Sequence, residues 1–333
     1  MRTAQRRDER AFGAPRQCDR HGIPAPKSKV FEDFPEAVRY LDRIEPPFVI
    51  KADGLAGGKG VVIAADQEGA REALKASLVD GVFGEAGLKV LIEEYLEGRE
   101  VSALALTDVR RAVPLALARD YKRALDGDLG SNTGGMGAYS PVEFVDDKTE
   151  VQIVDEILQA MVGALEAEGV RYRGVVYAGL MLTADGPKVL EFNARFGDPE
   201  TQVILPRMQA NLTDVLLACV EGNLAHYELT WTPEACVGVV LTSAGYPGSF
   251  EAGKVITGLD AASALADVQV FHSGTVARDD RVVTAGGRVL TVTALGSDID
   301  EARARAYEAC SLIDFEGMTY RRDIAATAVQ GMA

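Results

Sequence analysis

Three observations predict an α/β (α+β) chain of two or three domains. The 333 residues are 47% hydrophobic and 26% charged, which is typical of a folded globular protein of this size. Strand-like and helix-like segments alternate along most of the chain, which favours a mixed α/β architecture. The last hundred or so residues carry several strands and one helix, and this pattern predicts a separate small α+β unit.

The predicted elements of the first half follow from local patterns. A helix is expected at 35–43, where Pro35 suits the first turn. An apolar stripe of Ile153, Ile157, Met161 and Leu165 predicts an amphipathic helix over 149–167. The remaining expected elements are strands at 47–52, 60–65, 88–94, 99–107 and 111–118, and a helix at 68–79.

The second half begins with a predicted hairpin. Strands at 175–183 and 187–193 flank the turn Ala184-Asp185-Gly186-Pro187. The elements expected after it are a helix at 211–221, strands at 236–243, 268–272 and 288–295, and a helix at 300–313.

Composition excludes several classes of protein. The net charge of −15 argues against an electrostatic nucleic-acid binder, which needs a basic face. No apolar run reaches the roughly 18 residues of a membrane span, so we expect a soluble protein without a membrane partner. The four cysteines and three histidines show no metal-binding spacing. Reduced thiols and a cytoplasmic location fit this pattern best.

The first 20 residues differ in composition from the rest. They hold six arginines and three acids inside a chain that is otherwise strongly acidic, and no apolar segment of a secretory signal follows. Asp8 and Glu9 argue against an organellar transit peptide. We expect residues 1–20 to be a disordered leader, or the sequence to begin at a start that is not the natural one.

The segment from Val189 to Val203 is the most informative in the chain. An apolar strand ends in Glu191 and Asn193, whose side chains point to the same face while Phe192 packs on the other. Magnesium in nucleotide sites takes one or two such oxygen donors and completes its shell with phosphates. A polar strand end is the alternative. It is disfavoured because further charged groups follow at once: Arg195, Asp198 and Glu200.

A glycine-rich loop follows the strand that ends at Lys51. Its glycines leave backbone amides open to a phosphate and its lysines add charge, which suits a flap over a triphosphate. It is not a Walker A loop, since neither Ser nor Thr follows Lys59 and a strand comes next. A plain glycine-rich hairpin is the alternative. The candidate nucleotide-binding residues here are Lys51, Gly57, Gly58, Lys59 and Gly60.

Two further segments are candidate binding regions. The strand at 90–94 runs into a hinge whose backbone could pair with adenine. Glu100 could accept a hydrogen bond from the ribose. The other candidate nucleotide-binding residues of this hinge are Glu93, Glu94 and Leu96. An ordinary strand end is the alternative there. The irregular stretch 120–141 is rich in glycine and small polar residues, which favours an ordered substrate loop over disorder. Its candidate substrate residues are Asp120, Lys122, Asn132, Thr133, Gly134 and Gly135.

In this order, the four segments resemble the ATP-grasp ligases and, within them, the phosphoribosylamine–glycine ligase family. The segments that carry the resemblance are 51–60, 93–100, 132–139 and 190–202, together with Phe271-His-Ser-Gly-Thr275 and Phe315–Asp323 near the end. The resemblance covers about residues 21–326. The chain departs from the family at Ser131, where proline is usual. Gly179 stands where many ATP-grasp enzymes place a further acid.

The resemblance implies an ATP-grasp fold with a small C-terminal α+β domain. The expected division is a leader at 1–20, a linker at 21–46, a small ATP-grasp subdomain at 47–108, a central subdomain at 109–226 and a C-terminal domain at 227–333.

The resemblance also implies a reaction. ATP would activate glycine as glycyl phosphate, and the amine of phosphoribosylamine would capture it to give glycinamide ribonucleotide in purine biosynthesis. Glu191 and Asn193 would hold Mg²⁺ or Mn²⁺, with Lys51 and Lys59 on the phosphates. Arg195 would stabilise developing charge or hold a carboxylate, and Asp198 would hold an amine.

The largest departure lies at the start. The family begins with a nucleotide-like lobe of roughly a hundred residues, and no such segment is found here. We therefore expect ATP binding by this chain but little synthesis by it alone, and a separately encoded lobe is one hypothesis for a partner. Another ATP-grasp carboxylate–amine ligase and a non-catalytic ATP-binding remnant stay open as alternatives.

Overall fold

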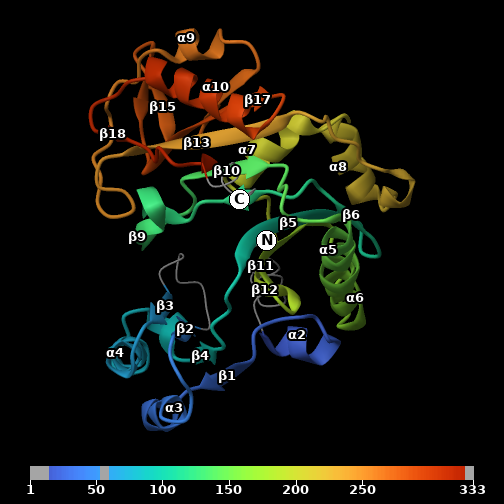
Figure 1. Cartoon of the computed structure of the whole chain (residues 1–333), viewed down its shortest axis with the longest axis vertical. Helices are drawn as coiled ribbons and strands as arrows, with labels where there is room; N and C mark the ends of the chain where they lie inside the picture. Colours follow the sequence, from blue (N-terminus) through green and yellow to red (C-terminus); the bar gives the residue numbers. More distant parts are fainter. Residues whose placement is uncertain (1–14, 53–59, 327–333) are drawn as a thin grey trace.

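Three sheets follow one another along the long axis of the molecule. The structure is a computed structural model that describes residues 15–52 and 60–326. Figure 1 shows a blue amino-terminal sheet at one end, a green central sheet, and an orange and red carboxy-terminal sheet at the other end. Among the described residues, no helix combines the length and the apolar character that crossing a membrane requires.

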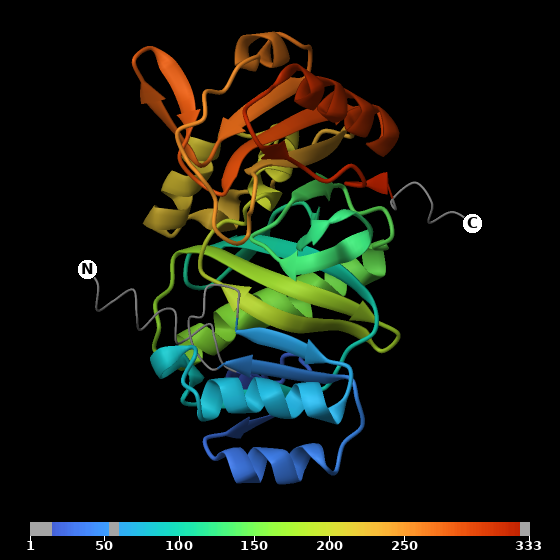
Figure 2. The same cartoon turned by 90° about the vertical axis from the view of Figure 1, so that its left-hand side faces the viewer.

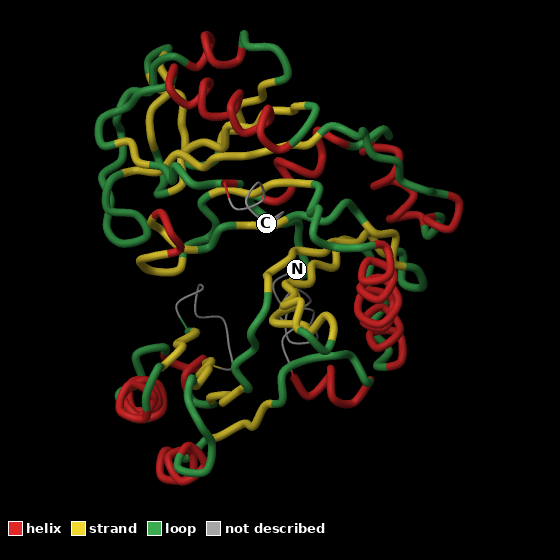
Figure 3. Tube along the Cα trace, in the orientation of Figure 1, coloured by secondary structure: helices red, strands yellow, loops and turns green. Residues whose placement is uncertain are grey.

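The amino-terminal sheet has four antiparallel strands with two helices on one face (Figure 3). Asp33 and Asp66 cap the two helices by accepting a hydrogen bond from a first-turn amide. The strand order is β1-β4-β2-β3, and the elements are β1 (Ser28–Phe31), α3 (Phe34–Leu41), β2 (Phe48–Ala52), β3 (Val61–Ala64), α4 (Gln67–Leu78), η1 (Gly84–Gly87) and β4 (Val90–Glu93).

The central sheet is covered on both faces. Because side chains alternate along a strand, β5 sends Val101 and Ala103 to one core and Leu104 and Leu106 to the other. The strand order is β12-β11-β5-β6, with β5 (Arg99–Thr107), β6 (Ala112–Pro114), β11 (Gly174–Thr183) and β12 (Gly186–Asn193). The covering helices are α2 (Pro15–His21), α5 (Asp147–Gln152), η3 (Ile153–Gln159) and α6 (Ala160–Ala167) on one face, and α7 (Glu200–Ile204), η4 (Leu205–Arg207), α8 (Leu212–Glu221) and η5 (Leu224–His226) on the other.

The carboxy-terminal sheet has six strands, and helix α10 packs against it. The β15–β16 hairpin is a separate two-stranded sheet that projects from the body of the molecule (Figure 2). The elements are β7 (Arg119–Asp120), β10 (Gly137–Ser140), β13 (Ala235–Ser243), α9 (Leu259–Ser263), β14 (Val268–His272), β15 (Thr275–Arg278), β16 (Arg281–Thr284), β17 (Arg288–Gly296), α10 (Ile299–Leu312) and β18 (Met318–Thr319). A separate hairpin carries β8 (Arg123–Leu125), η2 (Asp126–Asp128) and β9 (Leu129–Asn132).

Most of the expected elements are confirmed within a few residues. The apolar stripe is buried, as expected; it consists of Ile153, Ile157, Met161 and Leu165. Burial of each such side chain stabilises the folded state by about 1.5–3 kcal/mol. The expected helix over 149–167 is interrupted, since η3 is a π-helical segment between α5 and α6. The strand expected at 111–118 is regular only over Ala112–Pro114. Beyond it, the Leu115 amide still donates to the Leu104 backbone oxygen at 2.8 Å, and Ala118 forms an isolated bridge with Ser102.

Three regions differ from expectation. Within 15–46, where a leader and a linker were expected, α2 packs on α6 while β1 and α3 belong to the amino-terminal sheet. The stretch 120–141 contains β8 to β10. Strand β10 pairs with β13, which lies about a hundred residues later. The carboxy-terminal sheet therefore includes residues from before position 227, and no local pattern can reveal such a distant pairing.

Candidate active site

The end of β12 presents two oxygen-bearing side chains with free polar groups. Glu191 is exposed, and among the described residues no hydrogen bond or ion pair engages its carboxylate. The side-chain nitrogen of Asn193 is buried and, in the same part of the chain, has no hydrogen-bond partner. Phe192, between them, is 9% exposed and packs in the core on the opposite face. A free carboxylate beside an unsatisfied amide fits a divalent cation that also binds phosphate oxygens.

The strand beside this pair carries Gly179, at the position where many ATP-grasp enzymes place a further acid. Gly179 of β11 lies opposite Glu191 in the ladder. A Cβ atom at position 179 would come within 3.1 Å of Glu191 Cγ. A larger side chain there would displace Glu191, so this arrangement leaves the space to the Glu191 carboxylate.

Lys51 connects the amino-terminal sheet to the same strand end. Its ammonium lies 2.6 Å from Glu93 Oε2 and donates to the backbone oxygen of Leu190 at 3.1 Å. Lys51 is 19% exposed and Glu93 only 6%. The backbone oxygen of Leu190 directly precedes Glu191, so the structure brings Lys51 next to the candidate metal pair. The carboxylate of Glu93 is occupied by Lys51.

The glycine-rich loop is described only at its two ends. Gly57, Gly58 and Lys59 lie outside the described residues. At the base of the loop, the backbone oxygen of Gly60 accepts a hydrogen bond from the Ala52 amide at 2.9 Å.

Two apolar side chains share the face that carries Lys51. Val61 is directly opposite Lys51 in the ladder, and Ile63 is opposite Val49. Residues that face each other across antiparallel strands point to the same side of the sheet. Val61 and Ile63 are 40% and 52% exposed, so this face offers an uncovered apolar wall beside the lysine.

The hinge after β4 is held by contacts from two distant segments. Glu94 Oε2 accepts from the Lys27 amide at 3.3 Å and lies 3.7 Å from the Lys188 ammonium. Leu96 is buried. Lys188 was not expected from the sequence, because a single lysine within a strand carries no local signal of a partner in another sheet.

Carboxylates gather around Lys122. Its ammonium lies 2.6 Å from Glu100 Oε2, and Asp120 is near enough to interact electrostatically. Burial lowers the pKa of Lys122, but the charges of Asp120 and Glu100 more than offset this and hold that pKa well above its usual range. Burial raises the pKa of Asp120 to about 7; Lys122 opposes the rise, and Glu200, Glu100 and Glu191 add to it. One compact charged cluster therefore extends from Lys122 towards the metal pair.

Glu200 is a buried acid that joins this cluster. It is 3% exposed, and its Oε1 accepts from Ser102 Oγ at 3.0 Å and Tyr177 Oη at 2.9 Å. Burial raises the pKa of Tyr177 well above its usual range, and Glu200 adds to this effect. Glu200 was expected from the sequence as one of several charged groups. Ser102 and Tyr177 were not, because serine and tyrosine are common in strands.

Arg195 and Asp198 lie on the turn that follows β12. The Arg195 guanidinium is 5.8 Å from the centre of the Tyr177 ring and donates to the backbone oxygen of Phe196. Both carboxylate oxygens of Asp198 are engaged: Oδ1 accepts from Gln202 at 2.8 Å, and Oδ2 from Arg288 at 2.9 Å. The structure thus assigns Asp198 an arginine partner.

Arg288 joins three parts of the chain. This β17 residue also donates to the backbone oxygens of Asp198 at 2.7 Å and Gly134 at 2.6 Å. The Tyr246 hydroxyl accepts from the Gly134 amide at 2.9 Å. Neither Arg288 nor Tyr246 was expected from sequence, since both lie over a hundred residues from the loop that they hold.

The loop expected to bind substrate is ordered. Thr133 Oγ1 donates to the Lys122 backbone oxygen at 2.8 Å and accepts from the Gly135 amide at 3.0 Å. Gly135 has φ +111°, and a Cβ atom there would meet Pro199 Cδ at 2.3 Å. The loop therefore packs closely against the turn after β12. Asn132 ends β9 and is exposed.

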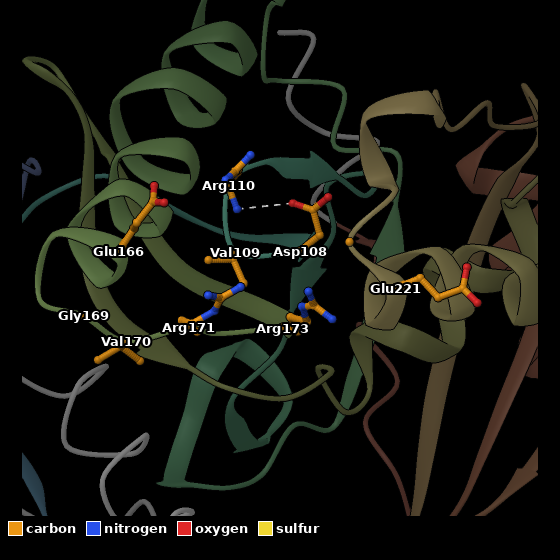
Figure 4. A pocket seen from close by; sticks show the side chains of 10 residues that line it. Asp108, Val109, Arg110, Glu166, Gly169, Val170, Arg171, Arg173 and Glu221 are labelled. Carbon is orange, nitrogen blue, oxygen red and sulfur yellow. Dashed lines mark hydrogen bonds between the residues drawn. The ribbon is translucent and has the colours of Figure 1, made fainter.

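The cavity in Figure 4 lies elsewhere. It is lined by charges of both signs, among them Asp108, Arg171 and Glu221. Asp108 follows Thr107, at the end of β5 opposite to Glu100. Because strands rise about 3.3 Å per residue, roughly 25 Å separates the two ends, so this cavity is distinct from the site.

The chain matches two domain models of one enzyme family over most of its length. Residues 13–201 match the family model of the phosphoribosylglycinamide synthetase ATP-grasp (A) domain, and residues 236–327 match that of its C domain. The chain is 48% identical to the phosphoribosylamine–glycine ligase of Halalkalibacterium halodurans, over 93% of this chain and 71% of the relative. For the same enzyme of Caulobacter vibrioides the identity is 47%, over 99% and 77% of the two chains.

Solved structures extend the comparison. The phosphoribosylamine–glycine ligase of Thermotoga maritima superposes with a TM-score of 0.87 at 37% identity, covering 95% of this chain and 80% of that one. A biotin carboxylase domain from Hydrogenobacter thermophilus, solved with MgADP and bicarbonate, has a TM-score of 0.73 at 14% identity, covering 94% and 68%. This second likeness concerns the fold alone, and the expected ATP-grasp fold is confirmed.

Proposed function

Because the chain belongs to the phosphoribosylamine–glycine ligase family of ATP-dependent carbon–nitrogen ligases, we propose that it joins glycine to 5-phosphoribosylamine. The products are glycinamide ribonucleotide, ADP and phosphate. The observation that carries this proposal is the meeting of Lys51, the Glu191–Asn193 pair and the Lys122 cluster in one place.

ATP binds along the amino-terminal sheet in this proposal. The ammonium of Lys51 and the loop with Gly57, Gly58, Lys59 and Gly60 hold the phosphates, while Val61 and Ile63 provide an apolar wall for the base. The backbone of the hinge from Glu93 to Leu96 pairs with adenine, and Glu100 accepts from the ribose.

Glu191 and Asn193 hold the divalent cation, Mg²⁺ or Mn²⁺, together with phosphate oxygens. When bound, the cation neutralises charge on the phosphates and so lowers the barrier to phosphoryl transfer. Asn193 fits this role because its buried side-chain nitrogen lacks a partner among the described residues and is free to donate to a phosphate oxygen.

The reaction has two steps. A carboxylate oxygen of glycine attacks the γ-phosphorus, the bond to the ADP oxygen breaks, and glycyl phosphate forms. The amine of phosphoribosylamine then attacks the carbonyl carbon, phosphate leaves and the amine loses a proton. Lys51 and Arg195 stabilise the charge that develops on the transferred group. Asp120, Lys122 and the loop from Asn132 to Gly135 orient the substrates, and Asp198 with Arg288 fixes that loop.

We place this chemistry in the cytoplasm. All four cysteines are free and buried, which suits a reducing compartment.

An assay of ADP release tests the proposal. Glycine should stimulate magnesium-dependent ADP release more than alanine, serine or bicarbonate does, and adding phosphoribosylamine should yield a small amount of glycinamide ribonucleotide. The variant Glu191→Ala should lose this activity, whereas Glu156→Ala, an exposed acid on η3, should retain it. Stimulation by another acid and none by glycine would contradict the assignment.

A further inference from the structure

Arg321 is a buried arginine near the end of the described chain. Its side chain is 1% exposed. The guanidinium lies 2.8 Å from Asp128 Oδ1 and 2.6 Å from Asp323 Oδ2, and it donates to the backbone oxygen of Arg123 at 3.1 Å. Burying a charge is costly unless it is paired and hydrogen-bonded. This pairing couples the segment after β18 to the β8–β9 hairpin.

Two hydrogen bonds from backbone amides to carboxylates strengthen the same connection. The Asp323 carboxylate accepts from the Gly127 amide at 2.8 Å, and the Asp126 carboxylate accepts from the Arg322 amide at 2.8 Å. Asp323 therefore holds Arg321 and the turn of the hairpin at once.

The segment that carries Arg321 also contacts both neighbours of Lys122 in the chain. The ring centre of Tyr121 lies 4.9 Å from the Arg321 guanidinium, and the Tyr121 hydroxyl accepts from the Ala325 amide at 3.0 Å. On the other side, the backbone oxygen of Arg123 accepts from Arg321. The residues before and after Lys122 are therefore both held by the end of the carboxy-terminal domain.

Lys122 itself is restrained at its backbone and at its ammonium. The Thr133 amide and Oγ1 each donate to the Lys122 backbone oxygen at 2.8 Å, and the Lys122 ammonium lies 2.6 Å from Glu100. The direction of the Lys122 side chain therefore depends on how the hairpin is placed.

The hairpin has little core of its own. Leu125 and Leu129 are 58% and 64% exposed, and all four residues of β9 are exposed. An isolated two-stranded hairpin is marginally stable in water. Its position must therefore come from contacts outside it, among which Arg321 provides a buried anchor.

We propose that Arg321 is a positioning residue, which fixes the β8–β9 hairpin so that Lys122 and the Thr133 loop are aimed at the carboxylate substrate, glycine. This inference rests on the proposed function. It assigns the end of the carboxy-terminal domain a part in binding glycine and no part in binding ATP. Within the described residues, the hydrogen bonds of the Arg321 side chain go to the β8–β9 hairpin and to Asp323, and not to the amino-terminal sheet.

Steady-state kinetics and hydrogen exchange test the inference together. Arg321→Met should raise KM for glycine about tenfold and leave the Kd for magnesium-ATP within about twofold. Among the described residues, the contacts of the Arg321 side chain go to the hairpin, Asp323 and Tyr121 and to no residue assigned to ATP. Without substrates, amide exchange in residues 123–132 should become faster. Arg321→Lys keeps the charge but cannot bridge the same acceptors, so it should fall between wild type and Arg321→Met.

Arg303→Met is the matched control. Arg303 donates to the backbone oxygens of Arg322 and Ile324, so it holds the same segment without a hydrogen bond to the hairpin among the described residues. This variant should leave KM for glycine and exchange in the hairpin unchanged. Equal effects of the two variants would mean general loosening of the segment and would overturn the inference.

Asp128→Asn is a second variant that tests the same inference if Arg321→Met fails to fold. Asp128 is 58% exposed and has φ +55°, a conformation that asparagine tolerates. Asp128→Asn should speed amide exchange in the hairpin and raise KM for glycine, each by a smaller factor than Arg321→Met does. No change in either quantity would refute the positioning role. A wild-type chain without glycine-dependent ADP release would count against the proposed function, while hydrogen exchange would still decide whether Arg321 holds the hairpin.

Discussion

At the scale of single residues, the site is made of charged groups that restrain one another. Lys51 is held by Glu93 and by the backbone of Leu190, and Lys122 by Glu100. Glu191 is the exception, since no such partner engages it among the described residues. Groups that are already restrained lose little freedom when a ligand binds, which favours binding.

The metal pair leads to the first prediction. Glu191→Ala removes a charged ligand and should weaken magnesium-ATP binding by about 10- to 100-fold. Asn193→Asp keeps an oxygen at the same place and adds charge, so its effect should be much smaller. Isothermal calorimetry measures both, with Glu156→Ala as the control for loss of an exposed acid. Equal affinities for the two site variants would point to a cation held elsewhere.

The pKa of Asp120 leads to a pH-dependent prediction. Burial raises it to about 7 in the folded protein, above the value of about 3.9 in an unfolded chain. The folded state therefore binds more protons between these values, and this contribution to stability is present below about pH 4 and lost as the pH rises through 7. Asp120→Asn should gain melting temperature relative to wild type as the pH rises from about 4 to about 8. A constant difference across that range, measured by calorimetry, would contradict the raised pKa.

At the scale of elements, close packing of short loops decides the geometry. The Thr133–Gly135 loop, the turn after β12 and strand β17 meet within hydrogen-bonding distance, although they are far apart in sequence. Gly135 makes this approach possible, because it has a positive φ and no side chain towards Pro199.

Gly135→Ala should destabilise the protein more than Gly186→Ala. Both glycines have similar φ values, +111° and +108°, but a Cβ at 135 would meet Pro199 Cδ at 2.3 Å, whereas nothing lies within 4 Å at 186. Both variants carry the same backbone strain, so the difference between their free energies of unfolding comes from the steric clash at position 135. We expect this difference to be about 1–3 kcal/mol. Urea denaturation of the two variants measures it, and equal midpoints would refute close packing of the loop.

At the scale of the whole molecule, the site draws on all three sheets. The amino-terminal sheet supplies Lys51, the central sheet Glu191 and Asn193, and the carboxy-terminal sheet Arg288. Figure 1 shows the central sheet lying between the other two. Contacts between sheets are therefore as important to this site as the strands themselves.

Arg288→Met tests the contribution of the carboxy-terminal sheet. Arg288 is 21% exposed and makes three hydrogen bonds to Asp198 and Gly134. Their loss should cost about 2–4 kcal/mol in unfolding free energy, because charge-assisted bonds contribute more than neutral ones. It should also lower glycine-dependent ADP release. Arg281→Met, on the exposed β15–β16 hairpin, is the control and should change neither. If Arg288→Met kept the unfolding free energy and the ADP release of wild type, the hydrogen bonds of Arg288 would have no part in the site.

The fold class, most helices and strands, and the local parts of the site follow from the amino-acid sequence alone. Glu191 and Asn193 share a face because strands alternate, and a buried stripe at 153–165 follows from helical spacing. The partners of these groups depend instead on how distant segments pack together. Arg288 lies 90 positions from Asp198 in the chain, and Arg321 lies 193 positions from Asp128. Strand β10 likewise pairs with β13 across a long stretch of chain. Such pairings depend on packing in three dimensions, which leaves no periodic trace in the sequence.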